Sequence, residues 1–270
     1  METKEYPCGK TAVYRFDAAG TPKAVLLLVH GFGEHSGRYS DWAAKFNEKG
    51  VSVIAFDLPG HGRSDGRRGV MPPFEVLYDT IDIILKDIAA EFPGIPRLIY
   101  GHSLGGGIVL DYLIHRKPPL TGAIATSPWI NLAFEPPPAR KLLASVASRI
   151  MPGMTQPSGL KTEYLSRDPV VVEAYRTDPL VHGIISAGVF GSITGAGKEI
   201  LSRASEITLP LLLVHGRNDM ITSSAATMEV AAAAPAATLK LWDGGYHELH
   251  NDLLREEHFE FIIEWIDTLL

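Results

Sequence analysis

Short apolar runs alternate with amphipathic stretches along most of the chain. The apolar runs are rich in Val, Ile and Leu and are bounded by Gly, Pro or polar residues, which is the pattern of buried strands. Most of the stretches between them have helical periodicity, so the sequence predicts an α/β fold with a mainly parallel sheet covered by helices on both faces. The predicted strands are 24–29, 51–56, 97–100, 122–126, 210–214 and 238–242, and a weaker alternation predicts another at 11–16.

This alternation of strand and helix patterns is interrupted between Trp129 and Thr208. Segments that look helical are interrupted there by prolines, and no clear strand pattern lies between them. A strand as apolar as those before the break follows at Leu209, which indicates that the sheet is interrupted rather than finished. We therefore interpret 129–208 as an inserted, mainly helical cap on a core formed by 1–128 and 209–270. The interrupting prolines are Pro136, Pro137, Pro138, Pro152 and Pro157.

Length and composition are compatible with one such domain carrying an insertion. The 270 residues are 46% hydrophobic and 21% charged, so a large core is available. A formal net charge of −6 and a pI near 5.9 give no broad attraction for phosphate backbones, which argues against a nucleic-acid partner.

The N-terminal segment and the single cysteine indicate the compartment. Charges and a proline stand where a secretory signal has an apolar stretch, so we expect a cytoplasmic protein. Cys8 has no partner for an internal disulfide and lies near a terminus that we expect to be mobile, so we interpret it as inert. No apolar run approaches the roughly 20 residues that span a bilayer, and any membrane contact is expected to be peripheral, through the cap.

The segment Gly101-His102-Ser103-Leu104-Gly105 follows a predicted strand and precedes a predicted helix. This is the setting of a nucleophile elbow, in which small neighbours make room for a strained serine at the N-terminus of a helix. The pattern alone is weak, because a glycine-rich turn between strand and helix can hold an incidental serine. The prediction of Ser103 as nucleophile therefore depends on finding an acid and a base.

Both partners follow the expected strands in the expected order. A serine hydroxyl needs a base to take its proton and an acid to orient that base. Asp219 lies in the loop after the strand at 210–214, and His247 lies in the loop after the strand at 238–242. We therefore predict Asp219 as the acid and His247 as the base. The nearby alternatives are His250, Asp243 and Asp252.

Two backbone N–H groups are predicted to form the oxyanion hole. One belongs to Leu104, the residue after the nucleophile, and the other to Phe32, in the glycine-flanked loop after the strand at 24–29. The loop that begins at Asp57 is expected to be structural, with no catalytic role for His61. No cofactor or metal site is predicted, because the candidate ligands are scattered over three loops without a metal-binding spacing. These scattered residues are Glu34, His35, His61 and His102.

Five segments together resemble the monoacylglycerol lipase and lysophospholipase branch of the α/β hydrolases, a group also called serine aminopeptidase S33-like or hydrolase-4. The resemblance covers nearly the whole chain, with the segments in the order of the family. The segments are H-G-F-G-E-H-S-G-R-Y from His30, D-L-P-G-H-G-R-S-D-G from Asp57, G-H-S-L-G-G from Gly101, V-H-G-R-N-D from Val214 and G-Y-H-E-L-H-N-D from Gly245.

The resemblance implies an α/β-hydrolase fold with an antiparallel strand at 11–16 and a mobile lid at 129–208. It also implies the triad Ser103, Asp219 and His247, the oxyanion donors Phe32 and Leu104, and no cofactor. The implied substrate is a small lipid ester, either a monoacylglycerol or a lysophospholipid, cleaved through an acyl-enzyme on Ser103.

The substrate class rests mainly on this resemblance. Apolar residues of the cap suit an acyl chamber, but the same residues would also suit the cap's own core. A carboxylesterase for shorter acyl esters is the nearest alternative, and a ligand-binding receptor on a hydrolase scaffold is a more distant one. A peptidase is disfavoured because nothing specifies recognition of a free amino terminus. The apolar cap residues are Leu142, Leu143, Val146, Ile150, Met151, Met154 and Phe190.

Overall fold

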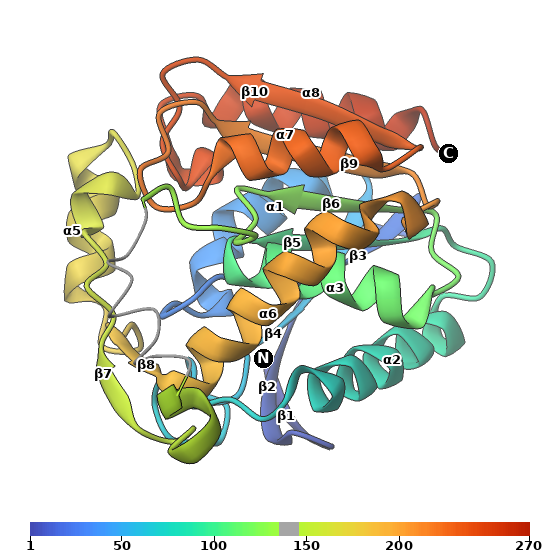
Figure 1. Ribbon diagram of the computed structural model, residues 1–270. Coiled ribbons are helices and arrows are strands. Elements are labelled where there is room, and N and C mark those ends of the chain that lie inside the picture. The colour runs from blue at the N-terminus through green and yellow to red at the C-terminus, as the bar shows by residue number, and fades with distance from the viewer. Residues whose placement is uncertain (135–145) are drawn as a thin grey trace.

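An eight-stranded sheet forms the centre of the molecule (Figure 1). The computed structural model describes residues 1–134 and 146–270. The strand order is β1-β2-β4-β3-β5-β6-β9-β10, in which the strands from β4 to β10 run parallel and β1 and β2 are antiparallel. The predicted mainly parallel sheet is thus confirmed. Its strands are β1 (Glu2–Tyr6), β2 (Gly9–Phe16), β3 (Ala24–Val29), β4 (Val51–Phe56), β5 (Arg97–His102), β6 (Gly122–Thr126), β9 (Leu211–Gly216) and β10 (Ala237–Trp242).

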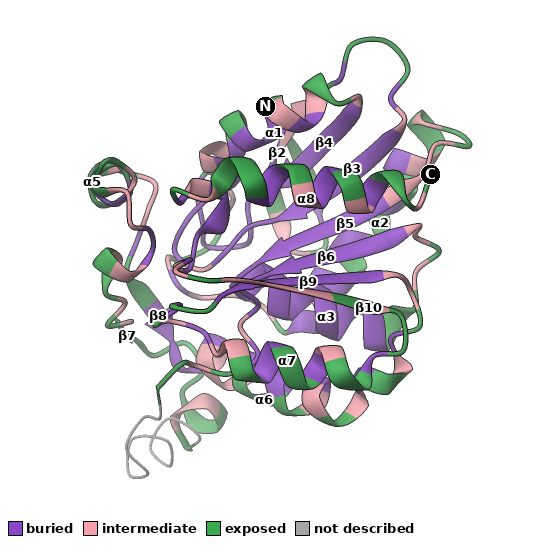
Figure 2. Cartoon of the chain, turned by 90° about the horizontal axis from the view of Figure 1, so that it is seen from above, coloured by how far each residue is buried: buried purple, intermediate pink, exposed green. Residues whose placement is uncertain are grey.

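Helices cover both faces of this sheet (Figure 2). Helices α1 and α8 pack on one face, whereas α2, α3, α6 and α7 pack on the other. Along β3, successive side chains alternate between these two cores, which is why the strand is apolar at every position. The helices include α1 (Ser40–Glu48), α2 (Phe74–Glu91), α3 (Leu104–Arg116), α5 (Pro169–Thr177), α6 (Ala187–Arg203), α7 (Ser224–Ala233) and α8 (Arg255–Asp267), and residues 146–150 are also helical. Short 3-10 helices occupy Ser36–Tyr39, Thr162–Tyr164, Ala204–Glu206 and Leu249–Asn251.

The register of the parallel strands brings their carboxyl ends to one edge of the sheet. Val29 of β3 pairs with Gly101 of β5, and Gly216 of β9 pairs with Trp242 of β10. The loops after these strands carry the predicted oxyanion, nucleophile, acid and base residues. In open parallel sheets this edge is where ligands bind.

The N-terminal segment is a strand rather than the mobile terminus that we expected. Strand β1 pairs with β2 in a hairpin, and Cys8 lies in its turn, where its Sγ is 3.3 Å from Thr11 Oγ1. The sequence did not reveal β1 because four of its five residues are exposed and polar, so the strand has no alternating apolar pattern.

The segment between β6 and β9 contains strands that the sequence did not predict. Strands β7 (Thr155–Pro157) and β8 (Ile184–Ser186) form a separate antiparallel pair, which lies with α5 at one end of the large sheet (Figure 1). Three-residue strands are too short to produce a periodic signal. Helix α6 instead packs against α3 and contributes Ile193 and Ile200 to the main core.

Several apolar residues of this segment are exposed. Met154 is 42% exposed and Ile150 is 73% exposed, whereas Phe190 is half-buried. Val146 and Met151 are exposed as well, so these four aliphatic and sulfur-containing side chains form neither a cap core nor a closed acyl chamber. The predicted interruptions at Pro136, Pro137 and Pro138 and the apolar Leu142 and Leu143 lie outside the described residues. Within the described ranges, no helix has the length and hydropathy needed to cross a membrane.

Candidate active site

Ser103 occupies a strained turn between β5 and α3. Its φ of 53° and ψ of −116° lie in a region that side-chain-bearing residues rarely adopt, and its N–H donates to Thr126 O at 3.0 Å. A Cβ at Gly101 would lie 2.4 Å from Gly105 O, and a Cβ at Gly105 would lie 2.1 Å from Val29 O. Both glycines are therefore required for this turn to form, as the sequence pattern indicates.

A continuous chain of hydrogen bonds joins the three predicted triad residues. Ser103 Oγ is 2.9 Å from His247 Nε2, and His247 Nδ1 is 2.7 Å from Asp219 Oδ2. Because an ionised carboxylate can only accept, Nδ1 carries the proton and donates to Asp219, and Nε2 is free to accept the serine proton. All three side chains are buried, so water competes little for these bonds. The arrangement is that of an activated nucleophile.

The Asp219 carboxylate is surrounded by donors. Its Oδ1 accepts from the N–H groups of Ile221 at 2.7 Å and Thr222 at 3.1 Å. Its Oδ2 accepts from Thr222 Oγ1 at 2.9 Å and lies 3.0 Å from His215 Nε2 as well as near His247. Burial raises the pKa of Asp219, but the two histidines outweigh it and hold the pKa well below its usual range. Asp219 therefore remains ionised at neutral pH.

Asp219 in turn sets the protonation of His247. Burial alone would lower the pKa of His247, but the charge of Asp219 and the hydrogen bond to it more than offset burial, so the pKa lies above its ordinary value. The neighbouring His102 and His250 have pKa values lowered by burial and remain neutral near pH 7. His247 thus gains proton affinity mainly from Asp219, and the charges of Glu248 and Glu34 add to it.

Three residues that the sequence did not identify hold Asp219 and His247 in place. Ser127 Oγ donates to the backbone carbonyl of His247 at 2.8 Å. Thr222 Oγ1 lies between Asp219 and the imidazole of His247, and His215 is fixed from its other nitrogen by Thr227 at 2.8 Å. Ser127 also has a positive φ of 43°, but such a conformation leaves no signal in a single sequence.

The predicted oxyanion donors lie beside the nucleophile. Leu104 is the first residue of α3, and the N–H groups of Leu104 and Phe32 have no acceptor within the described parts of the chain. A Cβ at Gly31, next to Phe32, would be 3.3 Å from Ser103 Cβ, so the loop after β3 closely approaches the serine. Two free N–H groups near a nucleophile are what a developing oxyanion requires.

A buried network of ion pairs links the loop after β3, which contains Phe32, to the loop after β10, which contains His247. Arg38 contacts Glu248 through both terminal guanidinium nitrogens, at 2.8 and 2.7 Å, and also pairs with Glu34. Glu34 accepts from Gly31 N–H and from Tyr39 Oη, each at 2.7 Å. Glu248 directly follows His247, so Arg38 links the two loops that frame Ser103.

We expect Arg38→Met to destabilise the protein by about 3–5 kcal/mol, because it leaves two buried carboxylates without their shared cation. Urea unfolding measures this change. The matched control is Arg15→Met, which removes the exposed pair with Glu91 and should cost less than about 1 kcal/mol. An equal decrease in the free energy of unfolding in the two variants would show that the Arg38 network contributes no more stability than a surface ion pair.

The other sequence candidates have structural contacts. Asp57 accepts from the N–H groups of Ser36 and Arg63, each at 2.8 Å, so its loop is fixed as expected. The exposed Asp243 pairs with Arg217, and Asp252 pairs with Arg167. The ring of His250 stacks on Tyr39, with 4.8 Å between centroids, and burial lowers its pKa to about 4. His61, with Nδ1 3.0 Å from Pro59 O, is fully buried in the same loop as Asp57.

Comparison with known proteins places this chain in a family. The profile of the serine aminopeptidase S33 family, Hydrolase_4, matches residues 20–253. The monoacylglycerol lipase of Mycolicibacterium smegmatis is 33% identical over 91% of this chain and 88% of its own length. An abhydrolase domain-containing protein of Dictyostelium discoideum is 36% identical over 91% of this chain, which spans only 26% of that relative.

A solved structure agrees with these sequence matches. The crystal structure of Paleococcus ferrophilus monoacylglycerol lipase superposes with a TM-score of 0.88 at 33% identity, covering 100% of both chains. The resemblance expected from the five sequence segments is thus confirmed. The chain belongs to the serine aminopeptidase S33, or Hydrolase_4, family of α/β hydrolases and is a carboxylic ester hydrolase.

Proposed function

We propose that this enzyme hydrolyses monoacylglycerols to a fatty acid and glycerol, through an acyl-enzyme on Ser103. The observation that carries the proposal is the hydrogen-bonded chain from Asp219 through His247 to Ser103. The similarity to monoacylglycerol lipases over nearly the whole chain supports the choice of ester. Lysophospholipids, which are also esters of a single fatty acid, are the second candidate substrate.

The reaction follows from the positions of these groups. His247 Nε2 takes the hydroxyl proton as Ser103 Oγ attacks the ester carbonyl carbon, and the N–H groups of Phe32 and Leu104 bind the resulting oxyanion. The C–O bond to glycerol breaks as His247 returns its proton to the leaving oxygen. A water molecule, deprotonated by His247, then attacks the acyl-enzyme and releases the fatty acid. Asp219 stays ionised and stabilises the imidazolium in both halves.

Aromatic side chains support an apolar path for the acyl chain. The rings of Phe32 and Trp129 are 6.3 Å apart and those of Trp129 and Phe190 are 6.4 Å apart, in edge-to-face contact. The backbone N–H of Trp129 donates to the backbone carbonyl of Ser103 at 2.8 Å, which ties the backbone of the central residue of this row to that of the nucleophile. The row continues into 129–208, which we take to be the cap, anchored to the core through α6. An acyl chain laid along these rings would lose contact with water.

The dependence on acyl length tests this function. Each buried methylene contributes about 0.8 kcal/mol, so two more carbons inside the path should raise kcat/KM by roughly tenfold. We expect kcat/KM for monoacylglycerols to rise from butyryl to medium or long chains. A maximum at acetyl or butyryl esters, with long monoacylglycerols left intact, would identify a short-chain carboxylesterase instead.

Exposed apolar residues of the cap support peripheral contact between a cytoplasmic enzyme and a lipid surface. Ile150 and Met151 are 73% and 57% exposed and lie beside the exposed Val146. The variant Ile150→Glu should reduce co-sedimentation with zwitterionic vesicles by about tenfold, because a charge replaces an inserted apolar side chain. The control Leu253→Glu changes an equally apolar exposed residue outside the cap, which is 64% exposed. Equal losses in both variants would exclude docking through the cap.

A further inference from the structure

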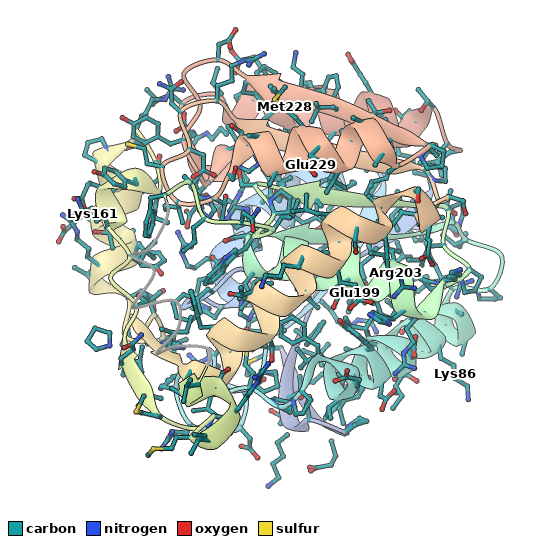
Figure 3. All side chains as sticks on the ribbon, in the orientation of Figure 1. Lys86, Lys161, Glu199, Arg203, Met228 and Glu229 are labelled. Atoms are coloured by element: carbon teal, nitrogen blue, oxygen red, sulfur yellow. The ribbon has the colours of Figure 1, made fainter. Side chains whose placement is uncertain are left out.

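Three potential ligand atoms converge between α3 and α6, away from the triad. Asp111 and His115 are four residues apart on α3, which places them on the same helix face. Glu199 reaches them from α6, and one ligand atom from each residue lies within 4.8 Å of the others. Figure 3 shows Glu199 near the C-terminal end of α6, where this helix crosses α3.

The Asp111 carboxylate lacks a partner on one side. Asp111 is only 5% exposed, and its Oδ2 accepts from Tyr78 Oη. Its Oδ1 is buried with no hydrogen-bond partner, and this is the oxygen that lies 3.7 Å from His115 Nε2. A buried carboxylate oxygen without a donor is costly, so this atom points to a cationic partner.

The distances from His115 to the two carboxylates are close to those between ligands of a small metal ion. His115 Nε2 lies 3.3 Å from Glu199 Oε1 and 3.7 Å from Asp111 Oδ1. Two ligands of a tetrahedral Zn²⁺, each about 2.0–2.1 Å from the ion, are roughly 3.4 Å apart. The imidazole ring is held nearly parallel to Tyr78, with an interplanar angle of 19° and 5.9 Å between centroids.

We propose that Asp111, His115 and Glu199 bind Zn²⁺, with water as the fourth ligand. One imidazole and two carboxylates are ligands that Zn²⁺ accepts, and the two carboxylates balance its charge. The ion joins α3, which begins directly after Ser103, to α6 in the cap. Its role is therefore structural, as a link between the cap helix and the helix of the nucleophile.

The neighbouring charges are compatible with this ion. Arg203 pairs with Glu199, but it also contacts both carboxylate oxygens of Glu206, at 2.8 and 3.0 Å. The oxygen that Arg203 contacts on Glu199 is Oε1, the same atom that faces His115, so the ion would take the place of Arg203 there, and Arg203 would keep Glu206 as its partner. Two further cations near this face also have carboxylate partners: Arg116 pairs with Asp79 and Asp82, and Lys117 pairs with Glu206.

Metal titration of the full-length protein tests the site. After treatment with a chelator, the protein should bind one equivalent of Zn²⁺, and at a free concentration about 100 times Kd its Tm should rise by about 5–10 °C. His115→Ala and Glu199→Gln should each weaken binding by at least about 100-fold and abolish the rise in Tm. The matched control Glu163→Gln, at an exposed carboxylate beside Arg176, should bind Zn²⁺ as the native chain does.

Esterase activity without metal checks that the variants fold, since neither substitution touches the triad. Three outcomes would overturn the proposal. No binding by the native chain would leave the three side chains as an ion-pair cluster only. Unchanged binding by His115→Ala would place the ion elsewhere, and an equal rise in Tm with Mg²⁺ in all variants would reflect non-specific charge screening.

Discussion

Ser103→Ala should lower kcat for any ester substrate by roughly 10⁵–10⁶-fold. The substitution removes the Oγ that lies 2.9 Å from His247 Nε2, so no acyl-enzyme can form. The oxyanion donors and substrate contacts remain, which leaves a small residual rate above that in water. Initial rates on a monoacylglycerol, with the variant purified free of native enzyme, measure the loss.

Labelling by a fluorophosphonate gives an independent measure of the same residue. The native chain and the control Ser205→Ala, at an exposed serine of the chain, should label equally, and Ser103→Ala should not label. If the native chain neither labels nor hydrolyses esters although it is folded, the triad is not functional. The ligand-binding receptor on a hydrolase scaffold would then become the better interpretation.

The fold could be predicted from sequence where burial is complete. The runs at 24–29 and 51–56 are the observed β3 and β4, residue for residue, because strands buried on both faces are almost entirely apolar. Strand β1 was missed because it is an exposed edge with no such constraint, and β7 and β8 because their three residues are too few to establish a period. The hydrophobic pattern of the sequence therefore reveals which strands are buried, and exposed or very short strands have no such pattern.

The candidate site was likewise predictable only in part. Ser103 could be found because its turn excludes a Cβ at Gly101 and Gly105, which is a local requirement. Arg38 and Glu248 are far apart in the chain and meet only in the folded state, so the network that frames the site leaves no local spacing. Glu199 was missed as a partner of His115 for the same reason.

Asp219→Asn should lower kcat by about 10⁴-fold while leaving the fold intact. In an asparagine side chain the amide oxygen can still accept from the N–H groups of Ile221 and Thr222. The amide nitrogen then takes the place of Oδ2 and donates to His247 Nδ1, which stabilises the wrong tautomer of His247. The exposed Asp243→Asn, in the loop before His247, is the matched control and should change kcat by less than about twofold. Near-native activity in Asp219→Asn would exclude Asp219 as the acid.

The pH profile separates this role from a structural one. His247 must be neutral to accept the serine proton, so activity is lost as the pH falls through its pKa. The charge of Asp219 raises that pKa above its ordinary value, and Asp219→Asn removes the charge. In Asp219→Asn the acidic limb of the kcat/KM profile should therefore move to lower pH, and the plateau value of kcat/KM should be lower than in the native chain. A variant that merely loosened the loop would lose activity with the acidic limb unmoved, because the charge acting on His247 would be the same.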